Sequence, residues 1–222
     1  MHLVELKAAG RPSAQNQPFG PPTRTTANHP FADFQRWCDR DRVNSTEKVA
    51  SPLDTFVSPI LGFAAWGVKQ GHGSFLTFEF GEPKLEVVER QSDGKGLSRS
   101  AYVYGQWHLW IYCCHWRALQ GGTQLASSED ENDLIYRAAA GLNGQKLLSV
   151  AVDPTQGRST FSFDLGGSLE TWPYGNEPAE KQWIIQTDTE AFAYRSDGLY
   201  SREPSNMTPK QQRWLPLLVN DS

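Results

Sequence analysis

Residues 105–119 (GQWHLWIYCCHWRAL) hold the densest set of side chains that could do chemistry, with three Trp, two His and two adjacent Cys between positions 107 and 116. On a strand, Cys113 and His115 would share one face, and that spacing could supply two zinc ligands. The chain offers no second paired motif, because its other histidines (His2, His29 and His72) are isolated. We therefore predict that this Cys-Cys-His run is structural, with no metal and no cofactor.

The pattern of 107–116 favours one central strand that is covered on both sides, because both of its faces are apolar. His108 and His115 would then face opposite ways, about 23 Å apart. One face would carry His108, Trp110, Tyr112 and Trp116, which could line a groove for a sugar, a nucleobase or the anchor residue of a partner. The alternative is that a helix or the N-terminal arm covers these rings as a second core layer.

Four acidic residues lie in two segments of similar rhythm, TFEFGEPKLEV (77–87) and SFDLGGSLET (162–171). If each segment is a β-hairpin, Glu79 would face Glu86, and Asp164 would face Glu170. Paired carboxylates can hydrolyse glycosides or bind a divalent cation. However, these acids alternate with Phe and Leu, as solvent-facing positions of a sheet do. We predict that all four belong to an exposed face that meets a basic partner.

Composition narrows the class of protein. The 222 residues include 21 Lys+Arg and 25 Asp+Glu, a formal net charge of -4, without the basic stripe typical of nucleic-acid binders. The apolar runs fall short of the roughly 20 residues that span a membrane, and the opening residues lack a signal-peptide pattern. With three Cys and no disulfide framework, we expect a reducing cytoplasm and no contact with nucleic acid or membrane.

Hydrophobic periodicity predicts an α+β fold, mainly antiparallel. Two β-meanders would be separated by one helix over 129–141, capped by Ser128 and Glu131, in a sandwich or strongly twisted sheet. Strands are predicted at 74–80, 85–89, 101–104, 107–116, 146–153, 159–165, 168–174, 182–187 and 191–195.

The predicted organisation has three parts. Residues 1–55 form an extended N-terminal arm with a short helix near 31–42, followed by a linker over 44–55. Residues 56–203 form the antiparallel α+β domain. Residues 204–222 form a C-terminal tail that packs only locally.

The stretch GLNGQKLLSVAVDPTQGRSTFSFDLGGSLETWPY, with WII after it, resembles small bacterial β-sheet proteins of the polymorphic-toxin immunity type over residues 141–200. The resemblance implies stoichiometric, non-catalytic binding to a partner protein, and no functional residue carries over. Our first hypothesis is therefore a cytoplasmic protein that binds another protein. The alternative is a small-molecule or sugar-binding domain, possibly a hydrolase, that uses the aromatic face of 107–116. Both hypotheses leave the oligomeric state open.

Overall fold

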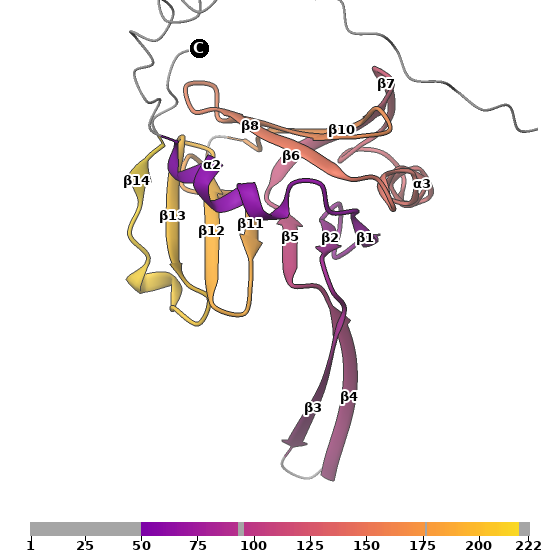
Figure 1. Cartoon of the computed structure of the whole chain (residues 1–222), viewed down its shortest axis with the longest axis vertical. Helices are drawn as coiled ribbons and strands as arrows, with labels where there is room; N and C mark the ends of the chain where they lie inside the picture. Colours follow the sequence, from indigo (N-terminus) through magenta and orange to yellow (C-terminus); the bar gives the residue numbers. More distant parts are fainter. Residues whose placement is uncertain (1–49, 93–95, 176, 218–222) are drawn as a thin grey trace, which may run out of the picture. The chain divides into compact units, whose positions relative to one another are not determined.

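The computed structural model describes residues 50–92, 96–175 and 177–217, which form two antiparallel sheets packed face to face with a hairpin beside them (Figure 1). In spatial order, the seven-stranded sheet comprises β1 (Trp66–Gln70), β2 (Leu76–Phe80), β5 (Trp107–Ile111), β11 (Lys181–Gln186), β12 (Glu190–Arg195), β13 (Leu199–Pro204) and β14 (Leu215–Pro216). The five-stranded sheet comprises β7 (Thr123–Ser127), β6 (Cys114–Gln120), β10 (Gly167–Pro173), β9 (Arg158–Phe163) and β8 (Leu147–Asp153). This arrangement confirms the predicted α+β class and its antiparallel sandwich, although two meanders around one helix describe it only loosely.

Aromatic side chains join the two sheets across one core. Phe78 of β2 stacks on Phe163 of β9 with ring centroids 6.2 Å apart, and Phe161 meets Trp183 edge to face at 5.5 Å. Alternation explains this choice of residues, because every second side chain of a strand points to the same face. Burial of these large rings is the main stabilising contribution at the centre of the sandwich.

Two α-helices flank the sheets. Helix α3 (Asn132–Leu142) packs against the edge strands β1 and β7 through Ile135, Ala138, Ala139 and Leu142, the apolar stripe of an amphipathic helix. The predicted helix is confirmed, but its cap is not: the N-cap is Glu131, without a side-chain capping bond. Helix α2 (Pro52–Val57) lies where a linker was predicted, and it begins with a capping box between Ser51 and Asp54. The described residues also include two short 3-10 helices, η1 (Ser58–Ile60) and η2 (Pro209–Gln211).

The predicted single strand 107–116 is wrong, because the chain changes sheets in its middle. β5 ends at Ile111 in the seven-stranded sheet, and β6 begins at Cys114 in the five-stranded sheet. Cys113 between them has a φ of +51°, a left-handed conformation that breaks the alternation of faces. β5 is central, between β2 and β11, but it is covered on one side only, since Trp110 on its outer side is 46% exposed.

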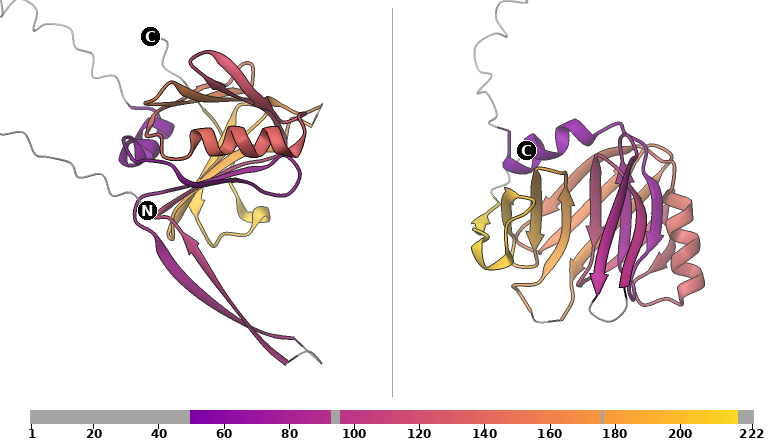
Figure 2. Two further views of the ribbon diagram at one scale, coloured as in Figure 1. Left: turned by 90° about the vertical axis from the view of Figure 1, so that its right-hand side faces the viewer. Right: turned by 90° about the horizontal axis from the view of Figure 1, so that it is seen from below.

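β3 (Lys84–Ser92) and β4 (Gly96–Tyr104) pair with each other and with no other described strand. They extend away from the sheets as a long two-stranded ribbon (Figures 1 and 2), which we call the projecting hairpin. The sequence predicted shorter strands, at 85–89 and 101–104, and it paired 85–89 with the strand before it. The segment 77–87 is not a hairpin, because β2 pairs with β1 and β5 rather than with β3.

Of the two predicted terminal segments, the structure describes most of the C-terminal tail but little of the N-terminal arm. The predicted N-terminal helix near 31–42 lies outside the described residues. The predicted tail contributes strand β14, buried Leu217, and Trp214, over which Arg195 lies with its guanidinium carbon 4.8 Å from the ring centroid. In the part of the chain that is described, no helix has both the length and the apolar character to cross a membrane.

Candidate binding site on the outer face of the seven-stranded sheet

A buried carboxylate and a histidine lie side by side on the outer face of β2 and β5. The Nδ1 atom of His108 is 2.6 Å from Oε1 of Glu79, and the backbone N–H of Gly105 donates to Oε2 of Glu79 at 2.9 Å. Glu79 is 5% exposed, so its charge depends on these two contacts. An ionised carboxylate only accepts, so Nδ1 of His108 is the donor. The Nε2 atom then remains for a bound molecule, since it makes no hydrogen bond to a described residue.

Two glycines lie beside Glu79 where the backbone is irregular or tightly packed. The pairing of β1 with β2 shifts register between Trp66 and Lys69, and Gly67 inside this irregularity has a φ of +58°. A Cβ on Gly67 would lie 3.4 Å from Cγ of Glu79. A Cβ on Gly105 would lie 2.5 Å from the carbonyl oxygen of Phe80. Such irregular, glycine-dependent backbone is common beside binding sites, because it re-aims a side chain. The sequence alternation predicted the face of Glu79 correctly, but not its burial.

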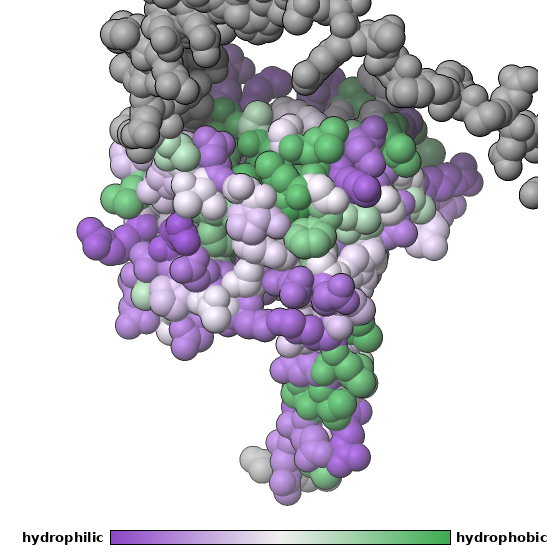
Figure 3. Space-filling model, in the orientation of Figure 1, coloured by the Kyte–Doolittle hydropathy of each residue, from purple (hydrophilic) through white to green (hydrophobic). Residues whose placement is uncertain are grey.

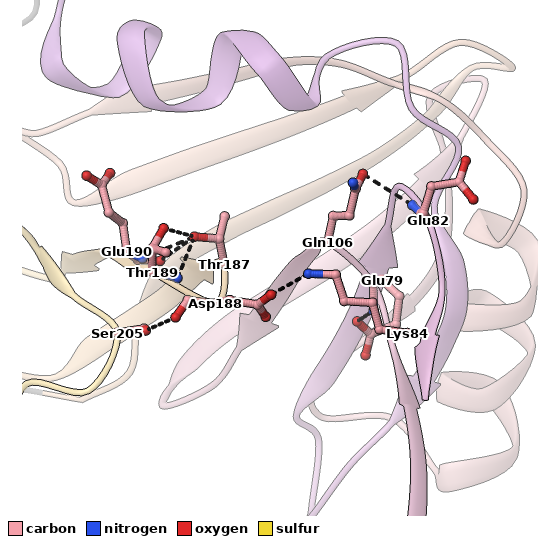
Figure 4. A network of polar contacts seen from close by, with 10 residues as sticks. Glu79, Glu82, Lys84, Gln106, Thr187, Asp188, Thr189, Glu190 and Ser205 are labelled. Carbon is pink, nitrogen blue, oxygen red and sulfur yellow. Dashed lines mark hydrogen bonds and ion pairs between the residues drawn. The ribbon is translucent and has the colours of Figure 1, made fainter. Parts of the chain in front are cut away.

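His108 lines a cleft of about 580 Å³ at the foot of the projecting hairpin. The remaining lining residues are Glu86, Tyr102, Tyr104, Gln186, Thr187, Asp188 and Ser205. Lys84 at the start of the hairpin ion-pairs with Asp188 in the β11–β12 turn, and the Ser205 hydroxyl donates to the Asp188 carbonyl (Figure 4). The Asp188 contact raises the pKa of Lys84. These contacts hold the foot of the hairpin against the sheet, and Asp188 and Ser205 line one side of the cleft.

Aromatic rings continue from His108 along the outer face. Trp110 meets His108 at 5.3 Å and Tyr112 at 6.4 Å, and Phe75 meets Tyr112 at 5.7 Å between ring centroids. His72 follows, 6.4 Å from Phe75. These five rings form what we call the aromatic row. At its far end lies a hollow of about 240 Å³ with an almost wholly apolar lining that includes Phe75, Thr77, Trp110 and Tyr112.

Three of the four residues predicted to line an aromatic groove share the outer face, and the fourth does not. His108, Trp110 and Tyr112 share the outer face, but Trp116 is 1% exposed in the core. Its indole N–H donates to the carbonyl of Ser74 at 2.7 Å, which ties β6 to the chain entering β2. The change of sheet at Cys113 reverses which residues face outward, and this reversal takes Trp116 out of the groove.

The four predicted acids do not form one surface. Glu79 lies on the outer side of the seven-stranded sheet and Glu86 on the projecting hairpin. Glu170 faces outward from the five-stranded sheet, paired with Arg117 at 2.7 Å. Asp164 lies in the β9–β10 turn, where its Oδ1 accepts the backbone N–H of Lys146 at 2.8 Å. The prediction that all four meet one partner is wrong, because it assumed that two similar segments fold alike.

The Cys-Cys-His run lies at the change of sheet. Cys113 and Cys114 are free thiols, and burial raises the pKa of both. His115 stacks on Trp172 with ring centroids 5.8 Å apart, and the tilted ring of Tyr174 lies 4.7 Å away. The Nδ1 atom of His115 lies 3.0 Å from Oε1 of Glu129. Within 50–92, 96–175 and 177–217, no three His, Cys, Asp or Glu side chains gather as a metal site would need.

Sequence reasoning missed several lining residues of the cleft. Tyr102 and Tyr104 alternate on β4 and so share one face of the hairpin, a pattern visible in AYVY. Gln186 pairs directly with His108 across β5 and β11, but the two residues are 78 positions apart in the sequence (186 minus 108). No local signal could have placed them together. No protein-family model, curated protein or solved structure matches this chain.

Proposed function

We propose that this chain is a non-catalytic binding protein that engages a partner protein through the projecting hairpin. One observation carries the proposal: one face of the hairpin exposes apolar side chains at its base and near its tip, on either side of the Glu89–Arg99 ion pair. Cross-strand pairing puts Leu85 opposite Val103 and Val87 opposite Ala101, with Leu97 nearer the tip. Leu85, Val87, Leu97 and Val103 are each more than half exposed, and Figure 3 shows apolar residues gathered along the hairpin. We call Leu85, Val87, Leu97, Ala101 and Val103 the apolar face.

A two-stranded ribbon is marginal in water without a third layer. The projecting hairpin has open backbone edges on both strands, besides its apolar face, since neither strand pairs with another described strand. Open edges and exposed apolar patches are both sites where another chain adds on. A partner that covered both would satisfy the backbone groups and bury the apolar side chains together.

The size of the hairpin favours a partner that surrounds it over a second copy of this chain. Nine residues per strand at about 3.3 Å each give a length of about 30 Å, and two strands of about 5 Å width each give a face on the order of 300 Å². Two such faces pressed together would bury far less than the roughly 1,200 Å² of a specific interface. A partner groove that contacts one face and both edges buries more surface per hairpin. The immunity-type resemblance of residues 141–200 and the expected cytoplasmic location belong to this same proposal.

The test compares the two faces of one strand. A photo-crosslinking amino acid is placed at Val103, on the apolar face, or at Ser100, which pairs with Val88 on the opposite face. After irradiation in the native host, position 103 should give one stoichiometric adduct and position 100 much less of it. The adduct protein, once purified, should bind the wild-type chain, and Val103→Asp should weaken that binding at least about tenfold.

Three outcomes would contradict the proposal. Equal cross-linking from both faces would mean that the contact is non-specific. Unchanged binding by Val103→Asp, with Ser100→Asp as the matched control, would remove the apolar face from the interface. An adduct made solely of this chain, with a dimer in sedimentation velocity that Val103→Asp dissociates, would replace the partner by a second copy.

A further inference from the structure

The outer face of β5 connects the polar cleft to the apolar hollow. His108 of β5 lines the cleft. Tyr112, four residues later and directly after the end of β5, lines the hollow. Trp110 lies between them and is 46% exposed, with Thr77 and Ile184 as its neighbours on the adjacent strands. Four residues of strand correspond to about 13 Å. A ligand that used both depressions would therefore have to cross Trp110.

The cleft has the chemistry of a cation site. Two of its carboxylates are Glu86, which forms no ion pair with a described residue, and Asp188, which pairs with Lys84. Glu79 adds a third negative charge behind His108, and none of the described Lys or Arg side chains lines the cleft itself. Tyr102 and Tyr104 add aromatic rings. Carboxylates with aromatic rings attract ammonium and guanidinium groups.

The hollow has the opposite chemistry. Its lining is almost wholly apolar, and its volume of about 240 Å³ is enough for one leucine-sized or larger side chain. One polar atom there lacks a partner: the hydroxyl oxygen of Thr77 is buried and makes no hydrogen bond to a described residue. Such a group is costly to bury, but the oxygen is closed to solvent, so it takes no part in contacting a ligand on the outer face.

We propose that the outer face of β5 binds an extended peptide segment carrying a lysine or arginine side chain in the cleft and an apolar side chain four residues away in the hollow. In an extended chain, residues four apart point to the same side and lie about 13 Å apart, which matches the spacing from His108 to Tyr112. This inference rests on the proposed function, because it gives the chemistry of a partner segment that reaches the sheet beside the projecting hairpin.

The probes are capped, fluorescently labelled peptides of Ser and Thr with two anchors, Arg and Leu four residues apart, made in both orders. Fluorescence anisotropy with the full chain should show that at least one order binds about tenfold or more tightly than peptides with Arg→Gln or Leu→Ser. A peptide with the anchors three residues apart should lose the same factor, since its anchors point to opposite sides. Equal binding of all these peptides would overturn the inference.

Variants of the protein assign each anchor to its depression. Glu86→Gln should weaken the Arg-bearing peptide and leave the Arg→Gln peptide unchanged, whereas Trp110→Ala should weaken both. The matched controls are Glu177→Gln and Tyr136→Ala, which alter other exposed residues. If no peptide discriminates while Val103→Asp still releases the cross-linked partner, this inference fails and the proposed function stands. If the two-anchor peptide binds but Val103→Asp leaves the partner bound, the proposed function fails instead.

Discussion

Two histidine–carboxylate pairs lie in the described part of the chain, one on each sheet, and they differ in what surrounds them. The side chains of His108 and Glu79 are 17% and 6% exposed, with Nδ1 and Oε1 2.6 Å apart. Those of His115 and Glu129 are 28% and 65% exposed, with the same atoms 3.0 Å apart. The first pair has a backbone donor to its carboxylate and a cleft beside its histidine, whereas the histidine of the second pair is in contact with the rings of Trp172 and Tyr174. A histidine and a glutamate thus form a candidate binding site only in the pair whose carboxylate is buried.

The largest effect should come from removing the buried carboxylate. Glu79→Ala leaves the N–H of Gly105 and Nδ1 of His108 without their acceptor, and breaking a buried pair costs about 3–5 kcal/mol of unfolding free energy. Urea denaturation measures this loss directly. If Glu79→Ala destabilised the protein no more than a surface substitution, the burial of this pair would contribute nothing to the fold.

A smaller loss should follow from crowding the backbone beside the same pair while both of its side chains stay in place. In Gly105→Ala the new Cβ would lie 2.5 Å from the carbonyl oxygen of Phe80, so the backbone must shift. Overpacking of this kind costs about 1–3 kcal/mol. Gly141→Ala is the matched control. Gly141 lies in α3, and its new Cβ would come no closer than 3.4 Å to a side-chain atom of Leu125 in β7, which is an ordinary contact. Equal stability of both variants would show that the tight approach at Gly105 is unnecessary.

Beside the second pair, the thiol of Cys114 should make the unfolding free energy depend on pH. Burial raises the pKa of Cys114 far above its ordinary value of 9.0, so the folded chain keeps this thiol protonated. Above pH 9 the unfolded chain loses that proton. The unfolding free energy is therefore unaffected by this thiol below pH 9 and falls above it, by up to about 1.4 kcal/mol per pH unit.

The comparison with Cys114→Ala isolates this effect, because burial also raises the pKa of Tyr112 and Tyr194, which titrate in alkali as well. Unfolding free energies measured from pH 8 to 10 should converge between the two proteins as pH rises. Parallel curves would mean that the thiol ionises as easily in the folded chain.

The smallest effect should come from the exposed carboxylate. Glu129→Gln keeps a hydrogen-bond acceptor near His115, and exposed ion pairs contribute only about 0–1 kcal/mol. We expect a change of no more than about 0.5 kcal/mol in urea denaturation. A loss comparable to that of Glu79→Ala would erase the difference between the two pairs.

Local pattern predicted most of the fold and part of the site. Hydrophobic periodicity predicted most of the strands and the helix, because its signals lie within a few residues of one another. The alternation that marks strands has limits, however. It failed at Cys113, where a non-glycine residue adopts a left-handed conformation without any sequence mark. It also missed β1, whose strand pattern is interrupted by Gly67. Alternation gives the face of a side chain but not what covers it, so Glu79 was expected in solvent.

The sheet order has a kinetic consequence. β5 pairs with β11, so the centre of the seven-stranded sheet joins two segments separated by the whole five-stranded sheet and α3. During synthesis the N-terminal strands must wait, with the β5 edge open, until residues 181–186 leave the ribosome. Long-range pairing of this kind slows folding and exposes unpaired edges to aggregation. We expect folding of the full chain to be limited by the docking of β11, and chains truncated before it to be the species that chaperones retain.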